Sequence, residues 1–321
     1  MSLRKRATGR VVTFGSANED LVYRVDRMPL TGETLLATTF SRGFGGKGAN
    51  QAIAAARSGA QSSLVGAVGS DDTGQRVVAN LSRHRVDASQ VHRSLDLPTG
   101  HACVMIDANG FNQIIVMAGA NSDVPHSIIE RAATELSSDD VAVIQCEIPA
   151  EQVAFAVLTA AHAGVQVLLN LAPFMPLPAD VLAAATLVVV NETEADELAI
   201  WLGCSHPRHE PDPEALARTL ATAVGTDCLI TLGEAGSVYC SAGCAPIKVP
   251  ASRVDTVVDT TGAGDVYVGT LAAELAQASE ITTAMTAAAA AAAASVRTPG
   301  AQFPPQFREE PPPFHPSPTI R

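Results

Sequence analysis

The sequence is short of basic residues, aromatic residues and long apolar runs, and these shortages exclude whole classes of protein. Aromatic residues make up only 4% of it, and 21 lysines and arginines stand against 33 acidic residues, for a formal net charge of −12. A protein with a basic surface for nucleic acid is therefore excluded, although a local pocket can still hold an anion. The most apolar stretch, residues 281–296, is mostly alanine and is too short to span a bilayer. We expect neither nucleic acid nor a membrane among the partners.

The sequence also lacks a Cys-x-x-Cys pair, although it contains six cysteines. Several of them lie in apolar runs, so we expect reduced, mostly buried thiols rather than a disulfide scaffold. Cys204, His206 and His209 could form a metal cluster, but no second pair of ligands accompanies them, and a surface loop is preferred. No apolar signal segment precedes the first expected strand, so we expect a cytoplasmic protein.

Apolar strands alternate with helical segments through the middle of the chain. Continuous apolar strands separated by helices indicate a parallel sheet that is covered on both faces. We therefore predict an α/β fold with a mostly parallel central sheet and helices on both faces. The strands are expected at 141–145, 165–170, 187–190 and 228–232, with helices near 151–163, 179–185, 193–202 and 213–224.

Two regions do not follow this alternation. Residues 21–44 contain turn residues and alternating threonines, which suggest short strands. Residues 101–117 form a hairpin candidate around Asn109-Gly110, a strong turn signal. We interpret both regions as a small β lid on one α/β domain that spans residues 10–303. Residues 304–321 are rich in proline and are expected to form an extended, flexible tail.

A first glycine-rich loop precedes a helix that begins near Lys47. Gly43, Gly45 and Gly48 match the pattern G-x-G-x-x-G, and Asp71 follows the next strand near the spacing of a dinucleotide site. Because Gly48 rather than serine or threonine follows Lys47, the loop is not a Walker phosphate loop. On this loop alone, a nicotinamide-dependent oxidoreductase and a helix entry that needs glycine for close packing both remain open.

The second glycine-rich loop, residues 258–265, also precedes a helix. Gly262, Ala263 and Gly264 are small enough for backbone N–H groups to converge on an anion at the helix N-terminus. Asp265 stands at the same helix start, where its charge would repel a phosphate that was only bound. Its presence makes sense if it takes a proton from an attacking hydroxyl while the amides stabilise a transferring phosphoryl group. A helix-capping role for Asp265 is the alternative, which leaves the small residues unexplained.

Phosphoryl transfer also needs charge neutralisation and a clamp on the acceptor. Asn191 and Glu194 follow the strand at 187–190, at the sheet edge where ligands gather. An ordinary helix start with acidic first-turn residues is the alternative for this pair. Asn18 and Asp20 follow the first strand, where they can hold sugar hydroxyls or simply form a turn.

Four segments together carry a resemblance to a known family. They are Gly-Ser-Ala-Asn-Glu-Asp at 15–20, Gly-Gly-Lys-Gly-Ala-Asn-Gln at 45–51, Asn-Glu-Thr-Glu at 191–194 and Asp-Thr-Thr-Gly-Ala-Gly-Asp at 259–265. The last is a highly specific signature, and most of the chain resembles the ribokinase/pfkB family of sugar and nucleoside kinases. The resemblance implies transfer of the γ-phosphoryl group of ATP to the 5-hydroxyl of D-ribose, with a ketose, deoxyribose or adenosine as alternative acceptors. It also implies Mg²⁺, K⁺ or another monovalent cation, and a homodimer formed through the lid.

The resemblance further implies a role for each matching position. Around the sugar it implies Asn18, Asp20, Gly46, Lys47, Gly48, Asn50 and Glu147. For the reaction it implies Asp265 as the base, with Gly262, Ala263 and Gly264 as the anion hole. Near the nucleotide it implies Asn191, Thr231, Leu232, Gly233, Glu234, Ala235, Gly236 and Gly264. Around K⁺ it implies Asp259, Thr261, Ser295, Thr298, Gly300 and Pro304, with Glu194 near Mg²⁺ through water.

The sequence departs from the family pattern at two places. Ala289 stands where the family often has a polar side chain near the adenine. Phe303-Pro304-Pro305 stands where the family usually has a serine among the K⁺ ligands. A sugar-sensing module built on an inactive kinase is a further alternative, but the intact Gly-Ala-Gly-Asp run argues against it, because a sensor has no use for a base there.

Overall fold

Short runs of valine, leucine and isoleucine form the strands of the main sheet, since such side chains pack well on a pleated surface that is buried on both sides. The computed structural model describes residues 9–204 and 212–302. Across the sheet the order is β14 (Ile247–Val249), β13 (Ser237–Cys240), β12 (Asp227–Thr231), β11 (Leu187–Asn191), β10 (Gln166–Asn170), β9 (Val141–Gln145), β1 (Arg10–Phe14), β4 (Gln61–Gly69) and β5 (Val86–Asp87), with β6 (Val91–Ser94) also paired to β4. The pairs from β12 through to β5 and β6 are parallel, whereas β13 and β14 pair antiparallel at one edge.

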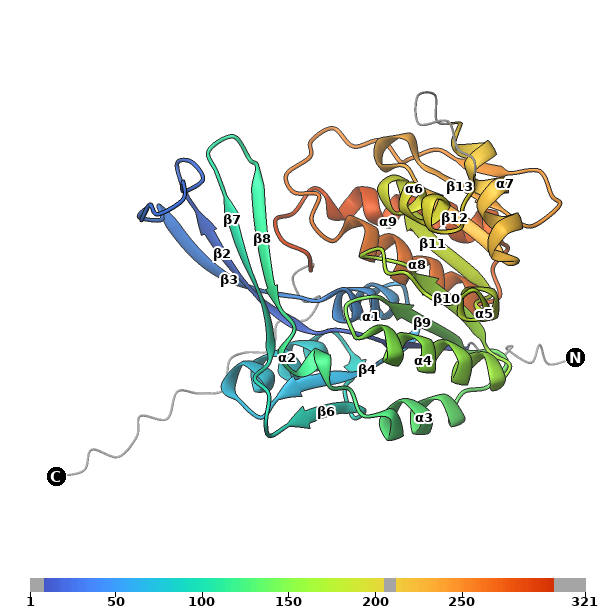
Figure 1. The fold of residues 1–321 in the computed structure, drawn as a ribbon, viewed down its shortest axis with the longest axis horizontal. Helices are drawn as coiled ribbons and strands as arrows, with labels where there is room; N and C mark the ends of the chain where they lie inside the picture. The colour runs from blue at the N-terminus through green and yellow to red at the C-terminus, as the bar shows by residue number, and fades with distance from the viewer. Residues whose placement is uncertain (1–8, 205–211, 303–321) are drawn as a thin grey trace, which may run out of the picture.

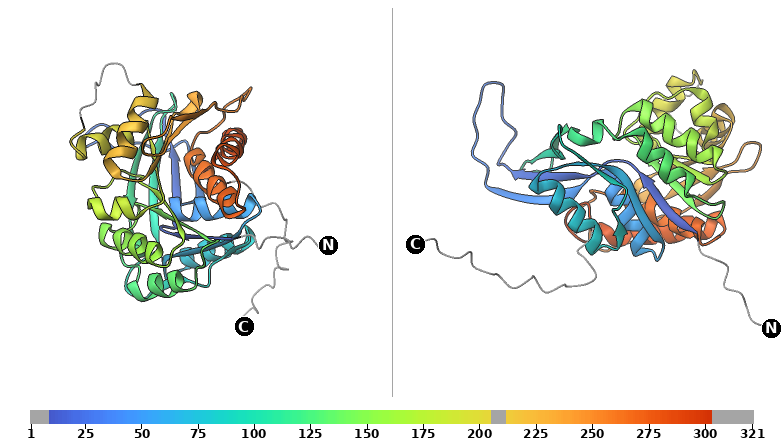
Figure 2. Two further views of the ribbon diagram at one scale, coloured as in Figure 1. Left: turned by 90° about the vertical axis from the view of Figure 1, so that its right-hand side faces the viewer. Right: turned by 90° about the horizontal axis from the view of Figure 1, so that it is seen from below.

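Helices cover both faces of this sheet, as the three views show together (Figure 1, Figure 2). One face carries α1 (Lys47–Arg57), α2 (Asp72–Arg83), α8 (Ala263–Ala276) and α9 (Ile281–Ser295). The other face carries α3 (His126–Thr134), α4 (Ala150–His162), α5 (Ala179–Ala184), α6 (Glu192–Trp201) and α7 (Pro213–Val224). The predicted fold class, a mostly parallel sheet covered on both faces, is confirmed.

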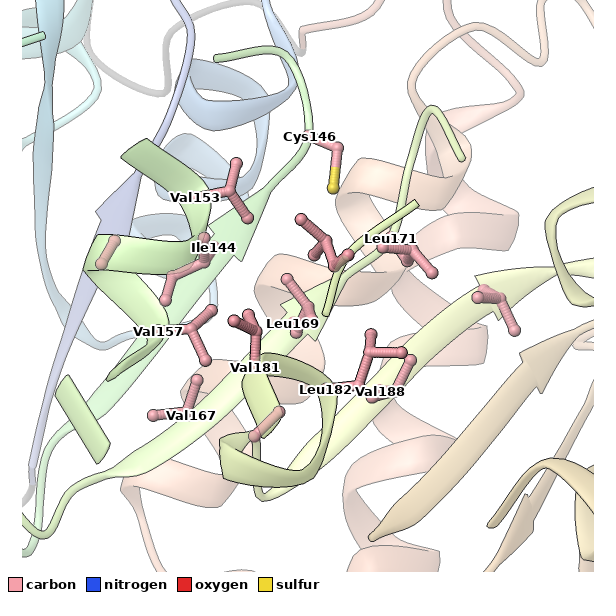
Figure 3. Close-up of a cluster of buried hydrophobic side chains, with 14 of the residues drawn as sticks. Ile144, Cys146, Val153, Val157, Val167, Leu169, Leu171, Val181, Leu182 and Val188 are labelled. Atoms are coloured by element: carbon pink, nitrogen blue, oxygen red, sulfur yellow. The ribbon is translucent and has the colours of Figure 1, made fainter. Parts of the chain in front are cut away.

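Successive strand residues alternate between two apolar layers, because neighbouring side chains of a strand point to opposite faces. Val143 of β9 and Leu168 of β10 are buried in the layer beneath α8. The next residues, Ile144 and Leu169, are buried in the layer that α4 and α5 cover (Figure 3). The two layers fix the sheet between the helices, so the carboxyl ends of the strands have defined positions.

A separate small sheet projects from one side of this body (Figure 1). Its strands lie in the order β3 (Thr39–Gly45), β2 (Asn18–Arg24), β7 (Gly100–Ile106) and β8 (Asn112–Met117). The expected hairpin at 101–117 is present as β7 and β8. Its connection is longer than the two-residue turn that Asn109-Gly110 suggested, because Asp107 Oδ1 accepts hydrogen bonds from the backbone N–H groups of Asn109 and Phe111 and closes a wider loop.

All the expected strands and helices of the alternating region are found, with ends that differ by no more than one residue. Sequence patterns did not reveal α3. They also did not reveal the short strands β5, β6, β13 and β14, because strands of two to four residues have too little periodicity to recognise. Among the described residues, no helix is both long and apolar enough to cross a membrane. His206, His209 and the tail at 304–321 lie outside the described residues.

Candidate active site

The first glycine-rich loop brings the N-terminus of α1 against the connection between β1 and β2. Gly46 precedes α1 with a φ of 88°, and a Cβ there would lie 2.8 Å from the Cα of Ala17. A Cβ at Gly48 would lie 2.7 Å from the backbone of Gly15 and Ser16. Both positions require glycine, so the close-packing interpretation of this loop is correct for the two residues that enter the helix.

The same loop is not a dinucleotide fingerprint. Gly43 and Gly45 lie on β3, an antiparallel strand of the small sheet, instead of ending a buried parallel strand. Asp71 caps α2 by accepting a hydrogen bond from the N–H of Gly74 at 2.7 Å, and it also accepts the N–H and hydroxyl of Thr99. Since this carboxylate is occupied by its own fold, the oxidoreductase alternative is wrong.

The second glycine-rich loop places a buried carboxylate between two helices. Asp265 lies in the first turn of α8 and is 7% exposed. Its Oδ2 accepts a hydrogen bond from Asn50 Nδ2 at 2.9 Å, and its Oδ1 accepts one from Gln51 Nε2 at 2.9 Å. Asp265 is not the N-cap of α8, since that position is Gly262, so the capping alternative is wrong.

Close packing of α1 and α8 makes these hydrogen bonds possible. A Cβ at Gly269 of α8 would lie 2.3 Å from the carbonyl oxygen of Gln51. Glycine at this position therefore lets the two helix backbones come within reach of short amide side chains. The approach carries Asn50 and Gln51 to the carboxylate of Asp265 on the facing helix.

The N-terminus of α8 is left open on one side by small residues. Gly262 has a φ of 76°, and a Cβ on it would lie 2.6 Å from the carbonyl oxygen of Ala301. Gly264, in contrast, faces open space, with no heavy atom within 4 Å of the position of a Cβ. Of the expected anion-hole amides, the N–H of Ala263 donates to the carbonyl of Thr260 at 3.2 Å. The partial positive charge of the helix N-terminus still faces this open space.

A second carboxylate, Glu147, follows β9 and is held at the start of α1. Its Oε2 accepts hydrogen bonds from the Ser16 hydroxyl at 2.6 Å and from the backbone N–H of Lys47 at 2.9 Å. The negative charge of Asp265, followed by those of Glu147 and Glu194, raises the pKa of Lys47. Lys47 is therefore a cation surrounded by acidic groups, at the point where α1, β9 and α8 meet.

Asn18 and Asp20 lie on strand β2 of the small sheet, whereas the sequence suggested a position directly after the first strand. Asn18 is buried, and its Oδ1 accepts a hydrogen bond from Asn121 Nδ2 at 2.7 Å. The Asp20 carboxylate lies against Gly45, where a Cβ would come within 2.3 Å of Oδ2. Asn18 and Asp20 are therefore presented by the small sheet to the same region as Lys47.

Burial raises the pKa of Asp20 to about 6. The negative charges of Glu147, Asp265 and Glu19 act in the same direction. Four carboxylates thus share one partly buried region, and burial together with the neighbouring negative charges moves the pKa of Asp20 toward neutrality.

Asn191 and Glu194 form a capping box at the start of α6. Asn191 Oδ1 accepts the N–H of Glu194 at 2.9 Å, and Glu194 Oε2 accepts the N–H of Asn191 at 2.8 Å. The ordinary helix start that was the alternative for this pair is therefore present. Burial also raises the pKa of Glu194, and the charges of Lys47 and Asp265 act on it, so the pair belongs to the same charge cluster.

The expected nucleotide loop, residues 231–236, follows β12 and is folded as a tight turn. The N–H of Leu232 donates to the carbonyl of Gly236 at 2.8 Å. Gly236 has a φ of 97°, and a Cβ on it would lie 2.1 Å from the carbonyl oxygen of Val249. The next residue, Ser237, shares a hydrogen bond of 2.8 Å with the hydroxyl of Tyr267 on α8. This contact links the loop to the helix that carries Asp265.

The residues expected around K⁺ lie on two loops that are bonded to each other. Asp259 accepts the N–H of Thr261 at 2.9 Å and the N–H of Gly300 at 2.8 Å. The carbonyl of Ser295 accepts both the N–H and the hydroxyl of Thr298 at 3.1 Å. Pro304 lies outside the described residues.

The donor atoms of these loops are oxygens, which suit a hard monovalent cation better than a transition metal. No group of three histidine, cysteine or acidic side chains is arranged to hold a metal within residues 9–204 and 212–302. A few carboxylates are nevertheless enough for Mg²⁺, which is usually bound by one or two of them together with phosphates and water.

Several polar residues of the site were not predicted from the sequence. Gln51 lies within the segment 45–51 but was not assigned, and Asn121, Asn170 and Gln302 come from distant parts of the chain. Gln51 Nε2 also donates to Asn170 Oδ1 at 2.9 Å, at the carboxyl end of β10. Only Gln51 could have been found from a local pattern, because the other three have no motif around them.

Comparison with known proteins identifies close relatives over almost the whole chain. A family model described as pfkB family carbohydrate kinase matches residues 8–308. A ribokinase of Bacillus subtilis is 37% identical over 292 residues, which cover 91% of this chain and 94% of that protein. A deoxyribokinase of Salmonella typhi is 33% identical over 293 residues, with the same two coverages of 91% and 94%.

A solved structure shares both the fold and the sequence pattern. Arabidopsis thaliana ribokinase, complexed with ribose and ATP, superimposes with a TM-score of 0.79 at 31% identity. The match covers 92% of this chain and 94% of that one. The small sheet and the helices on both faces are therefore features of a fold found in kinases of this kind.

We predict that replacing Asp20 by asparagine stabilises the protein increasingly as the pH rises. The pKa of Asp20 in the folded protein is raised from 3.8 to about 6. The contribution of Asp20 to the free energy of unfolding is therefore fully present below about pH 3.8, where the carboxyl is neutral in both states. It is lost as the pH rises through about 6. Chemical denaturation of wild type and Asp20→Asn, at several pH values between about 4 and about 8, measures the difference. Asp26→Asn, at an exposed position beyond β2, is the control. If the difference in free energy of unfolding between Asp20→Asn and wild type did not change with pH, the prediction would be contradicted.

Proposed function

The chain belongs to the pfkB family of carbohydrate kinases, and we propose that within this family it is a ribokinase, which transfers the γ-phosphoryl group of ATP to the 5-hydroxyl of D-ribose. The observation that carries the proposal is the buried carboxylate of Asp265 at the N-terminus of α8, held by Asn50 and Gln51. The relatives named ribokinase, at up to 37% identity, support ribose as the acceptor.

Asp265 acts as the base in the proposed reaction. It accepts the proton of the attacking hydroxyl as the new oxygen–phosphorus bond forms, and the bond from the γ-phosphorus to the bridging oxygen of ADP breaks. The open side of the α8 N-terminus, at Gly264, lies beside this carboxylate and can receive the negative charge of the phosphoryl group. The amides of Gly262 and Ala263 belong to the same turn.

The sugar occupies the region between the small sheet and α1 in this proposal. Asn18 and Asp20 reach it from β2, and the start of α1 contributes Lys47 and Asn50. Carboxylates and amides in this arrangement can accept and donate hydrogen bonds to several hydroxyls of one sugar. Gly46, Gly48 and Glu147 complete the proposed sugar site, the glycines by letting the chain pass close to the connection between β1 and β2.

The nucleotide lies across the carboxyl ends of β11 and β12 in the same proposal. Asn191 and the loop from Thr231 through Leu232, Gly233, Glu234 and Ala235 to Gly236 would contact it, and Gly264 would contact its phosphates. Glu194 would hold Mg²⁺ through water, and Mg²⁺ would neutralise phosphate charge. The proposed K⁺ site consists of Asp259, Thr261, Ser295, Thr298, Gly300 and Pro304. K⁺ bound there can fix the shape of the loop that precedes α8. The proposed use of ATP is consistent with a cytoplasmic location.

The small sheet is also the proposed dimer interface. Strand β8 forms an edge of it, and all six of its residues are exposed. Four of them are apolar, and Ile115 is 65% exposed. Exposed apolar edge strands tend to pair with another chain, so we propose a homodimer that forms through β8.

An ADP-release assay tests the proposed activity. We expect ADP formation that depends on D-ribose, is slower with deoxyribose, fructose or adenosine, and is stimulated by K⁺. The relative named deoxyribokinase makes deoxyribose the second candidate acceptor, because one changed contact in the lid shifts the preference between acceptors by only about a few kcal/mol. If turnover were faster with deoxyribose than with ribose, deoxyribose would be the preferred acceptor instead. Ribose binding without any ADP release would instead favour the sensor alternative.

The role of Asp265 is tested by Asp265→Asn. We expect kcat to fall by about three decades or more, because both a positioned base and its charge are lost. Ribose binding, measured by calorimetry, should persist. Glu274→Gln removes a carboxylate from the far end of α8 and should leave turnover unchanged. Turnover near that of wild type in Asp265→Asn would overturn the proposed mechanism.

The dimer is tested by Ile115→Lys. A charge in the middle of an apolar interface should shift the protein to monomer at micromolar concentration, as measured by sedimentation velocity. Leu95→Lys changes a residue that is 89% exposed outside the small sheet and should leave the mass unchanged. A wild-type monomer, or an Ile115→Lys dimer, would refute this interface.

A further inference from the structure

Four side chains form a continuous line of hydrogen bonds that ends on the carboxylate of Asp265. Asn80 Nδ2 donates to Gln302 Oε1 at 2.8 Å, and Gln302 Nε2 donates to Asn50 Oδ1 at 2.8 Å. Asn50 Nδ2 then donates to Asp265 Oδ2 at 2.9 Å. The line joins α2, the segment after α9, and α1 to the helix that carries the carboxylate.

The carboxylate determines the direction of every bond in this line. An ionised carboxylate only accepts hydrogen bonds, so Asn50 must present its NH₂ group to Asp265 and its oxygen to Gln302. Gln302 must therefore present its own NH₂ group to Asn50 and its oxygen to Asn80. Each amide has one donor end and one acceptor end, so a reversal at any position puts two acceptors face to face.

Burial makes such a reversal costly. Asn80 and Asn50 are each 6% exposed, and Asp265 is 7% exposed. Buried polar groups that lose their partners are not compensated by water, and the members of a network influence one another. Gln302 lies between Asn80 and Asn50, and neither Gln302 nor Asn80 belongs to a motif of the sequence.

We propose that Gln302 is a positioning residue that, with Asn80 behind it, holds the Asn50 amide in the orientation that the carboxylate of Asp265 requires, with its NH₂ group toward that carboxylate. The proposal rests on the proposed function, in which Asp265 is the base. Gln302 follows Gly300 by two residues, and the N–H of Gly300 donates to Asp259. The second member of the line therefore follows a turn that is itself bonded to the loop preceding α8.

The first test compares two replacements of Gln302. Gln302→Met removes both the donor to Asn50 and the acceptor for Asn80, so Asp265 alone orients Asn50, and kcat should fall by about threefold. Gln302→Glu is closer in shape but places an acceptor against Asn50 Oδ1, so kcat should fall by about tenfold or more. The KM for ATP should change in neither variant, because the loop at 231–236 is not part of the line. A kcat for Gln302→Glu equal to or above that of Gln302→Met would overturn the proposal.

The second test separates direction from charge alone. Asn80→Asp puts an acceptor against Gln302 Oε1, so Gln302 turns over and its oxygen meets that of Asn50. We expect kcat to fall by about fivefold in this variant, although Asn80 contacts Gln302 and not Asp265. In the Gln302→Met background, Asn80→Asp should lower kcat by less than about twofold, because no amide remains at position 302 to turn over and face Asn50 with its oxygen. Equal losses in both backgrounds would show that added charge alone is responsible, and would refute the proposal.

The same double-mutant cycle can be measured without turnover. The free energy of unfolding of wild type, Asn80→Asp, Gln302→Met and the double variant should be non-additive, with a smaller penalty for Asn80→Asp when Gln302 is absent. Additive penalties would contradict the line of bonds itself. If the wild type phosphorylated no sugar but the cycle remained non-additive, the proposed function would fail and the orienting role of Gln302 toward Asn50 would stand.

Discussion

The contact between α1 and α8 is the interaction on which the rest of the site depends. Gly269 lets the two helix backbones approach, and the carboxylate of Asp265 is then buried between Asn50 and Gln51. A buried charge is tolerated only where hydrogen bonds replace its water shell. The two amides supply those bonds, and the first turn of α8 adds its partial positive charge. Folding and chemistry thus use the same few atoms, since the groups that permit the charge also orient it.

The concentration of negative charge around this contact is the second constraint. Carboxylates from β2, the segment after β9, α6 and α8 surround a single lysine at the start of α1. Burial and these neighbouring charges together oppose ionisation at Asp20 and raise its pKa. The arrangement is suited to a ligand that brings many hydroxyls together with cations, because hydroxyls donate hydrogen bonds to the acids and cations offset their negative charge. The energetic cost of assembling the acids is therefore offset when such ligands bind.

Local motifs indicated the residue types of the site better than its packing. The segment at 259–265 indicated a carboxylate at a helix start, and the alternation of strands and helices indicated the covered parallel sheet. The sequence could not choose between a dinucleotide fingerprint and a close helix entry for Gly43, Gly45 and Gly48. That choice depends on whether the strand before the helix is parallel and buried or belongs to the small sheet. Asn18 and Asp20 were placed after the first strand for the same reason, because pairing partners are not encoded locally.

The sequence by itself determined the fold class, the positions of most long helices and strands, and the residue types available for phosphoryl transfer. These follow from periodicity and from short segments in which every residue is a chain neighbour of the next. Only the tertiary structure decided that Asn80, Gln302, Asn50 and Asp265 form one line, and that Asn121 holds Asn18. Those residues are separated by as many as 252 positions. A hydrogen bond depends on distance and direction in space, and the packing of distant helices brings its partners together.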